Sequence, residues 1–69
     1  MKTADLNKGD YFKTNTSDDV YKVTGERDEI AVKCANINTD MYVHLFLNVE
    51  VGQVLTEEEK EAVNDFYGI

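Results

Sequence analysis

The sequence predicts a small, mostly β domain: a five-stranded, strongly bent antiparallel sheet or small barrel, followed by a C-terminal α-helix. Three observations lead to this prediction. Short alternating apolar and polar runs recur through residues 10–54, the segments between them have hairpin length, and residues 56–67 change to helical periodicity. A chain of 69 residues has room for a single domain, 1–69, with the sheet in about 6–54 and the helix in 56–67.

The first two strands are predicted over residues 10–13 and 19–24. Leu6 precedes a turn at residues 7–9, in which Gly9 can adopt a positive φ angle. Polar residues at 15–18 separate the two strands. Tyr21 and Val23 share one face of the second strand, and residues 24–28 are predicted to form the hairpin loop that follows it.

The third strand, over residues 30–35, has the clearest alternation. Ile30, Val32 and Cys34 fall on one face and are expected in the core. A fifth, short strand is predicted at 50–54, after a bend at Asn48.

The fourth strand, over residues 41–47, is apolar on both faces. Tyr42, His44 and Phe46 alternate with aliphatic residues, so the strand is expected to be covered on both sides, with His44 packed beside Tyr42 and Phe46. The helix is the predicted cover for the aromatic face. A second copy of the chain is the alternative cover, and a homodimer is therefore also expected, because so short a chain buries little surface alone.

Capping residues indicate where the helix begins and ends. Thr56 is a good N-cap, Glu59 three residues later completes a capping box, and Gly68 is placed to end the helix. A helix of about three turns is not stable alone in water. Its apolar stripe is therefore expected to dock on the sheet, with Phe66 buried, and consists of Ala62, Val63, Phe66 and Tyr67.

The strand region resembles SH3-like small barrels. The resemblance is carried by "LNKGDYF", "DVYKVTG", "EIAVKCANI" and "YVHLFLNVEVGQV", where a G-D-x-F type opening strand precedes a V-Y-x-V strand. It covers most of residues 6–54 and implies a barrel-like variant of the bent sheet. The terminal helix is an addition to that layout.

No residues form a recognisable catalytic or metal-binding set, which predicts a non-enzymatic protein without cofactor or metal. Ser17, the one serine, lies in a polar turn without triad-like partners, and Cys34 with His44 are too few soft ligands for zinc. A single cysteine is typical of a reducing compartment, so a cytoplasmic location is expected. No apolar run approaches the length of a membrane span.

Charge is the one feature that points to a partner. Residues 1–33 hold seven acids and six bases, a net of −1, whereas residues 34–69 hold seven acids and one base, a net of −6. In the helix Glu57, Glu61 and Asp65 are four residues apart, with Glu58 beside them, so their side chains lie about 6 Å apart, close to the spacing of phosphates along a DNA strand. The predicted partner site is this face, extended by Asp40 or Glu50. Direct binding to nucleic acid is disfavoured, because phosphate contacts require Lys and Arg.

A solvated face is the alternative interpretation of these carboxylates. The first-turn acids are favoured by the helix dipole, and the repulsion between Glu61 and Asp65 costs only about 0.2–0.5 kcal/mol. The acidity, the size, the absence of Pro and the lack of a catalytic set are nevertheless similar to small bacteriophage-encoded host-takeover proteins, among them DNA mimics that block nucleoid proteins such as HU. This similarity implies an inhibitor in the bacterial cytoplasm whose partner is a basic DNA-binding protein: a nucleoid protein, polymerase or restriction component. The alternative function is an SH3-like interaction module whose acidity only maintains solubility.

Overall fold

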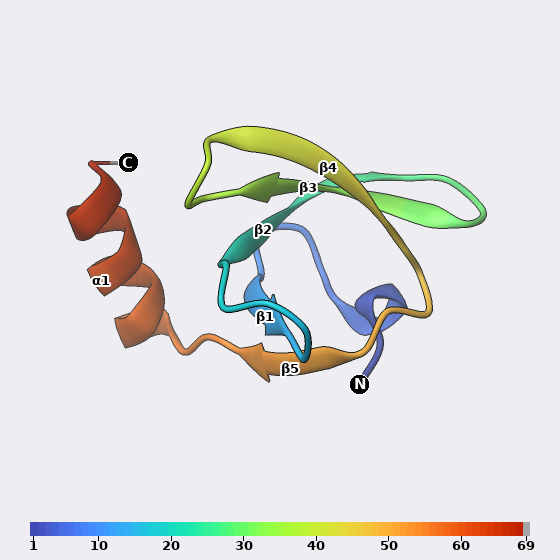
Figure 1. Cartoon of the computed structure of the whole chain (residues 1–69), viewed down its shortest axis with the longest axis horizontal. Coiled ribbons are helices and arrows are strands. Elements are labelled where there is room, and N and C mark those ends of the chain that lie inside the picture. Colours follow the sequence, from blue (N-terminus) through green and yellow to red (C-terminus); the bar gives the residue numbers. More distant parts are fainter. Residues whose placement is uncertain (69) are drawn as a thin grey trace.

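The computed structural model describes residues 1–68 and contains one five-stranded antiparallel sheet and one α-helix. The strands are β1 (Tyr11–Thr14), β2 (Tyr21–Arg27), β3 (Ala31–Asn36), β4 (Met41–Phe46) and β5 (Val51–Val54), and they lie in the order β4-β3-β2-β1-β5. A 3-10 turn, η1 (Thr3–Asp5), precedes the sheet, and α1 (Glu57–Tyr67) follows it. The sheet is open and bent, with α1 beyond one end of it (Figure 1). The predicted fold class is confirmed.

The main core lies on the concave side of the sheet, where alternate residues of neighbouring strands meet. Val32 and Cys34 of β3 are fully buried, as their alternation predicts, and Phe12 stacks on Tyr21 with ring centroids 5.6 Å apart. The buried members of this cluster are Leu6, Phe12, Val23, Val32 and Cys34. Val43, Leu45 and Leu47 pack against it, as predicted for the aliphatic face of the fourth strand, but Met41, the first residue of that face, is 65% exposed.

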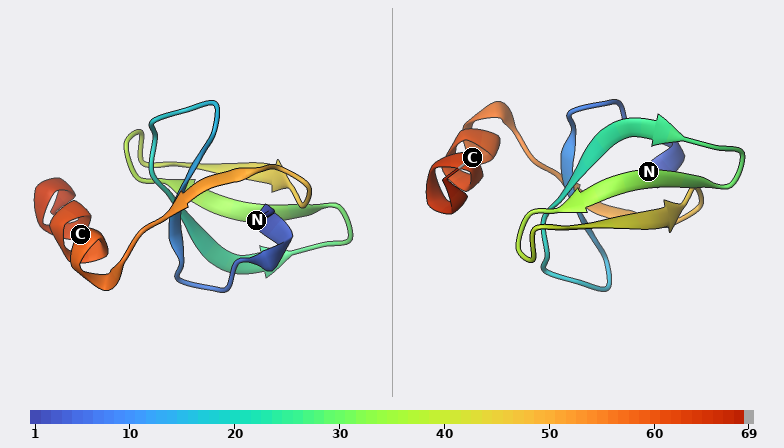
Figure 2. Two further views of the ribbon diagram at one scale, coloured as in Figure 1. Left: turned by 90° about the horizontal axis from the view of Figure 1, so that it is seen from below. Right: turned by 90° about the horizontal axis from the view of Figure 1, so that it is seen from above.

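A second apolar cluster lies on the opposite side of β1. Tyr11 points away from Phe12 because neighbouring strand residues face opposite ways. This cluster consists of Tyr11, Val20, Ile37 and Leu55, with Val63 of α1 packed against it. The helix therefore docks here, at the end of the sheet near the β3–β4 turn. Figure 2 shows the helix standing apart from the body of the sheet in both views.

Three sequence predictions are wrong. Ile30 is not a core residue, because β3 begins one residue later and Ile30 belongs to the preceding turn. Its N–H donates to the Asp28 carboxylate in that turn, and its side chain is 65% exposed. The aromatic face of β4 is not covered by α1, because the helix uses the second cluster instead. Tyr42 and Phe46 are 65% and 63% exposed, and His44, predicted to pack beside them on a covered face, is exposed too.

The second strand is also longer than predicted. Residues 25–27, predicted to lie in the hairpin loop, continue β2 to Arg27 through an irregular register between Val23 and Arg27. Gly25 allows this irregularity, since its φ of 98° is in the left-handed region. Gly9, with φ of 90°, has the positive angle predicted for its turn.

Candidate functional site

The predicted caps hold the ends of α1. The Glu59 N–H donates to Thr56 Oγ1 over 3.2 Å, and the Thr56 N–H donates to the Glu59 carboxylate over 3.0 Å. These two bonds form the capping box. At the other end Gly68 has φ of 71° and its N–H donates to the Asn64 carbonyl, which is the left-handed cap expected of a glycine.

The face of α1 that meets the sheet is partly polar. Its residues are spaced i, i+3, i+4 and i+7, which places them along one side of a helix: Lys60, Val63, Asn64 and Tyr67. The Tyr11 hydroxyl donates to Asn64 Oδ1 over 2.6 Å, and Asn38 Nδ2 donates to the Tyr67 hydroxyl over 2.9 Å. Val63 supplies the apolar contact between these two hydrogen bonds.

The prediction that Phe66 is buried is therefore wrong. Phe66 is 81% exposed, and Ala62 is exposed as well, because the four docking residues turn this part of the predicted apolar stripe outward. Of that stripe only Val63 packs against a buried cluster, while Tyr67 contributes mainly its hydroxyl and is 39% exposed. The spacing of Lys60 and Asn64, at i and i+4 on the same side as Val63, is the sequence signal for these polar docking residues.

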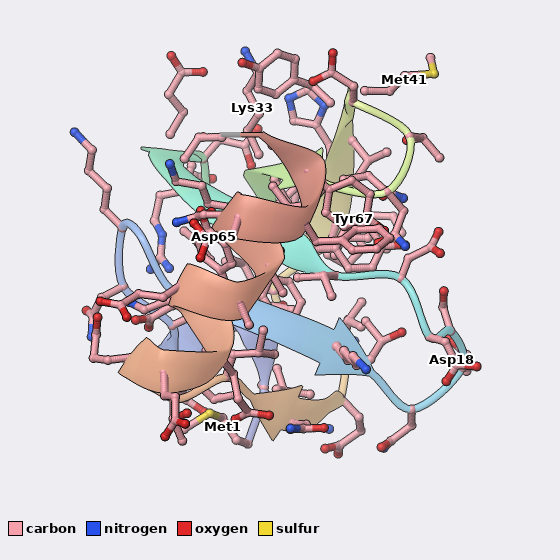
Figure 3. All side chains as sticks on the ribbon, turned by 90° about the vertical axis from the view of Figure 1, so that its left-hand side faces the viewer. Met1, Asp18, Lys33, Met41, Asp65 and Tyr67 are labelled. Carbon is pink, nitrogen blue, oxygen red and sulfur yellow. The ribbon has the colours of Figure 1, made fainter. Side chains whose placement is uncertain are left out.

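The outward side of α1 is acidic. We call Glu57, Glu58, Glu61 and Asp65 the acidic face. All four side chains are exposed, and Asp65 projects from the side of the helix opposite Tyr67 (Figure 3). Within residues 1–68 no ion pair involves Glu58, Glu61 or Asp65, so three of the four charges are unneutralised.

Lys60, the base on this helix, is directed toward the sheet rather than across the acidic face. Its side chain is 22% exposed, its Nζ lies 5.8 Å from the centre of the Tyr11 ring, and it forms an ion pair of 2.9 Å with Glu57 alone. The hydrogen bond to Glu57 raises the pKa of Lys60 above its ordinary value, although desolvation opposes the rise. The ammonium therefore stays charged while leaving most of the acidic face unscreened.

Glu59 has a separate, structural role. The Thr56 backbone N–H that it accepts lowers its pKa, and Gln53 Nε2 donates to the same carboxylate over 3.0 Å. This carboxylate is committed to the helix start and to β5. It is not part of the acidic face.

The two predicted extensions of the acidic face have different surroundings. Asp40 lies in the β3–β4 turn with φ of 59° and lines a shallow groove with Tyr67 and Gly68, so it is next to the C-terminal end of α1. Glu50 precedes β5, at the end of that strand farther from the helix (Figure 1), where it forms an ion pair with Lys2. The hydrogen bond from Lys2 lowers the pKa of Glu50. The structure thus places Asp40 near the C-terminal end of α1, on its Tyr67 side and not beside Asp65 (Figure 3), whereas Glu50 lies far from the helix.

Cys34 and His44 lie on opposite faces of the sheet. Cys34 is fully buried, as predicted, and burial raises the pKa of its thiol to about 11, which suppresses the reactive thiolate. His44 is exposed and lies opposite Lys33 on β3. The two residues therefore do not form a nucleophile and base. No group of three or more potential metal ligands occurs among residues 1–68, and no helix in that range has the length and apolar character of a membrane span.

Comparison with known proteins finds no matching family model, no similar curated protein and no similar solved structure.

Proposed function

We propose that this chain is a non-enzymatic binding protein that presents the acidic face of α1 to a basic, DNA-binding protein and occupies that protein's DNA site. The observation that carries the proposal is the direction of Lys60. The Lys60 ammonium points toward the Tyr11 ring and pairs with Glu57. The outward carboxylates of Glu58, Glu61 and Asp65 therefore form a negative surface without a neighbouring cation on α1.

The geometry of these carboxylates suits imitation of a phosphate row. Residues three and four apart on a helix lie about 5–6 Å from each other, and α1 holds Glu61 within that reach of both Glu58 and Asp65. Asp40 adds negative charge near the C-terminal end of α1, but on its Tyr67 side and outside this row. Such a row acts mainly through its summed field, which steers a basic partner and weakens with salt. The proposed location is the bacterial cytoplasm, where nucleoid proteins, polymerases and restriction enzymes offer such partners.

The test is competition for a DNA site. A purified nucleoid protein such as HU is first saturated with fluorescently labelled duplex DNA, and the protein is then added at low and at moderate salt. Displacement of the DNA, with an apparent affinity that falls steeply as salt rises, is the expected result. Retention of partners from a bacterial lysate on the immobilised protein extends the test to polymerase and restriction components.

Two variants with the same change in charge make the test specific. Glu58→Lys with Glu61→Lys reverses the acidic face and should abolish displacement, because repulsion replaces attraction. Glu26→Lys with Glu29→Lys makes the same change in charge at the β2–β3 hairpin, far from α1 (Figure 1). This variant should retain most of the ability to displace DNA. Both pairs are exposed, so both variants should fold.

Equal binding by the two variants would contradict the proposal and would show that the acidic face is merely solvated. A partner of neutral charge that stays bound at high salt would instead indicate the SH3-like interaction module.

A further inference from the structure

The outer edge of β4 carries backbone groups without partners. The Leu47 N–H donates to the Ile30 carbonyl over 3.0 Å, which makes these two residues a hydrogen-bonded pair of the β3–β4 ladder. Bonded and non-bonded pairs alternate along an antiparallel ladder. The N–H and C=O groups of Tyr42, His44 and Phe46 therefore point away from β3. The Phe46 carbonyl accepts the Thr3 hydroxyl, but the backbone of Tyr42 and His44 has no partner on this side within residues 1–68.

The N-terminal residues cover the β5 edge and also reach the last residue of β4, where the Thr3 hydroxyl donates to the Phe46 carbonyl, but they leave residues 42–45 of β4 open. At the β5 edge the N-terminal residues cover the start of the strand: the Val51 N–H donates to the Met1 carbonyl over 2.9 Å, and Lys2 pairs with Glu50. Exposed edges are normally protected by Lys, Pro, a bulge or a covering segment. β4 has neither Lys nor Pro, and its register with β3 runs without a shift over all six residues. Its residues 42–45 therefore remain an open edge with which another strand can pair.

Exposed apolar side chains surround this edge. Met41, Tyr42 and Phe46 of β4 and the neighbouring Ile30 are each between 63% and 65% exposed. Ile30 and Phe46 also line a shallow apolar groove with Leu47. Tyr42 and Phe46 lie on one face of β4 and Met41 on the other, and exposed apolar side chains of this kind are typical of a site of association. Because β4 contains no Asp or Glu, it is also a place where two molecules of net charge −7 can approach each other.

We infer that the β4 edge pairs antiparallel with the β4 edge of a second copy of this chain, with His44 of both copies at the two-fold axis. A two-fold axis perpendicular to the sheet keeps each side chain on its own face. With His44 opposite His44, Tyr42 of each copy lies opposite Phe46 of the other, and Val43 lies opposite Leu45. Aromatic residues then meet aromatic residues on the outer face, and aliphatic residues meet on the inner one.

The edge groups are complementary in this register. The two His44 residues exchange two backbone hydrogen bonds, and each Phe46 N–H reaches a Tyr42 carbonyl, which gives four bonds between groups that have no partner in the single chain. A register centred on Val43 also forms backbone bonds but sets Tyr42 against His44 and leaves the two Phe46 rings unpaired. The aromatic pairs therefore select the His44 register. The interface is smaller than a standard one, so we expect a dimer in the micromolar range.

Sedimentation equilibrium of the full chain tests the dimer. At about 100 μM the wild-type chain should be largely dimeric, and a single 7.9 kDa species there would overturn the inference. His44→Pro removes an outward N–H without breaking a bond within the sheet, so it should keep the fold and weaken dimerisation at least about tenfold. Phe46→Lys should do the same. Phe66→Lys changes a phenylalanine on α1 that is even more exposed than Phe46 and should leave the dimer intact. A dimer unaffected by both β4 changes would also overturn the inference.

Cross-linking tests the register independently of any loss of folding. His44→Cys places two thiols opposite each other at the axis, within disulfide reach, whereas Tyr42→Cys places them four residues apart along the strands. Mild oxidation should give a covalent dimer for the first variant and little for the second, and equal cross-linking would refute the pairing. Salt separates this inference from the proposed function: it should strengthen the dimer by screening the charge of two acidic molecules, while it weakens binding to a basic partner.

Discussion

The exposure of Phe66 leads to a quantitative prediction for Phe66→Ala. The side chain is 81% exposed, so only about a fifth of its surface is withdrawn from water. Full burial of a Phe is worth about 1.5–3 kcal/mol, and a fifth of that is about 0.3–0.6 kcal/mol. The edge-to-face contact with Tyr67, at 4.9 Å between ring centroids, adds about 0.5 kcal/mol, while Ala gains about as much from its higher helix propensity. The expected loss of unfolding free energy is therefore below about 1 kcal/mol.

Phe12→Ala is the matched comparison, since it removes the same atoms from a fully buried site. Such a change costs about 3–5 kcal/mol. A chain of 69 residues has a total stability of about 3–10 kcal/mol. Phe12→Ala should therefore remove much of the stability or unfold the protein.

Urea denaturation followed by circular dichroism measures both effects. It should be run at a protein concentration at which the chain is monomeric, so that association does not contribute. A loss above about 1.5 kcal/mol for Phe66→Ala would refute the reasoning, because it would require the ring to be buried in solution, against the sheet or against another chain. If the slope of the unfolding free energy against urea concentration (the m-value) is unchanged and only the midpoint shifts, the substitution has not altered the denatured state.

Three further predictions concern stability and reactivity. Thr56→Ala removes the N-cap of α1 and should cost about 1 kcal/mol of helix stability, measured by circular dichroism, whereas Thr16→Ala in the exposed β1–β2 loop should cost little. The backbone N–H groups of Ile30 and Ala31 lower the pKa of Asp28, so its contribution to stability is present above the ordinary Asp pKa of about 3.9 and is lost as the pH falls through the lower folded-state value. The difference in urea midpoint between the wild type and Asp28→Asn should shrink over that acid range, and a difference that is constant with pH would contradict this assignment. Cys34, with its pKa raised to about 11, should react with a thiol reagent at least about 100-fold more slowly in the folded protein than in urea, and equal rates would mean that the thiol is accessible.

The dimer and the acidic face use different parts of the molecule. β4 lies at one edge of the sheet, whereas α1 docks on the cluster around Tyr11 and leaves the outer edge of β4 open. A dimer through β4 would therefore leave both acidic faces free. Association would double the negative field without covering it, so the two proposals are compatible and are tested by separate variants.

Much of the candidate site follows from local rules in the sequence. The spacing of Glu57, Glu61 and Asp65 is sufficient to place them on one side of a helix, and the capping box and Gly68 give the ends of that helix. What the sequence does not reveal is the direction in which that side points. Lys60 and Asn64 face the sheet because the Tyr11 ring and hydroxyl are there to receive them, and Tyr11 is about fifty residues earlier in the chain. The sequence also does not reveal that Glu50, predicted to extend the acidic face, pairs with Lys2.

By itself, the sequence determined that five strands are followed along the chain by one helix, because alternation, turn residues and caps act between residues a few positions apart. It determined that Val32 and Cys34 are buried, since a strand with one apolar face must turn that face inward. Only the tertiary structure decided which apolar residues remain outside. Ile30, Phe46 and Phe66 have the same hydrophobicity as residues of the core, yet each is exposed, because a sheet this small has two sides and two edges and one short helix to cover them. Burial depends on which surface the helix reaches, and that is fixed by contacts between residues far apart in the chain.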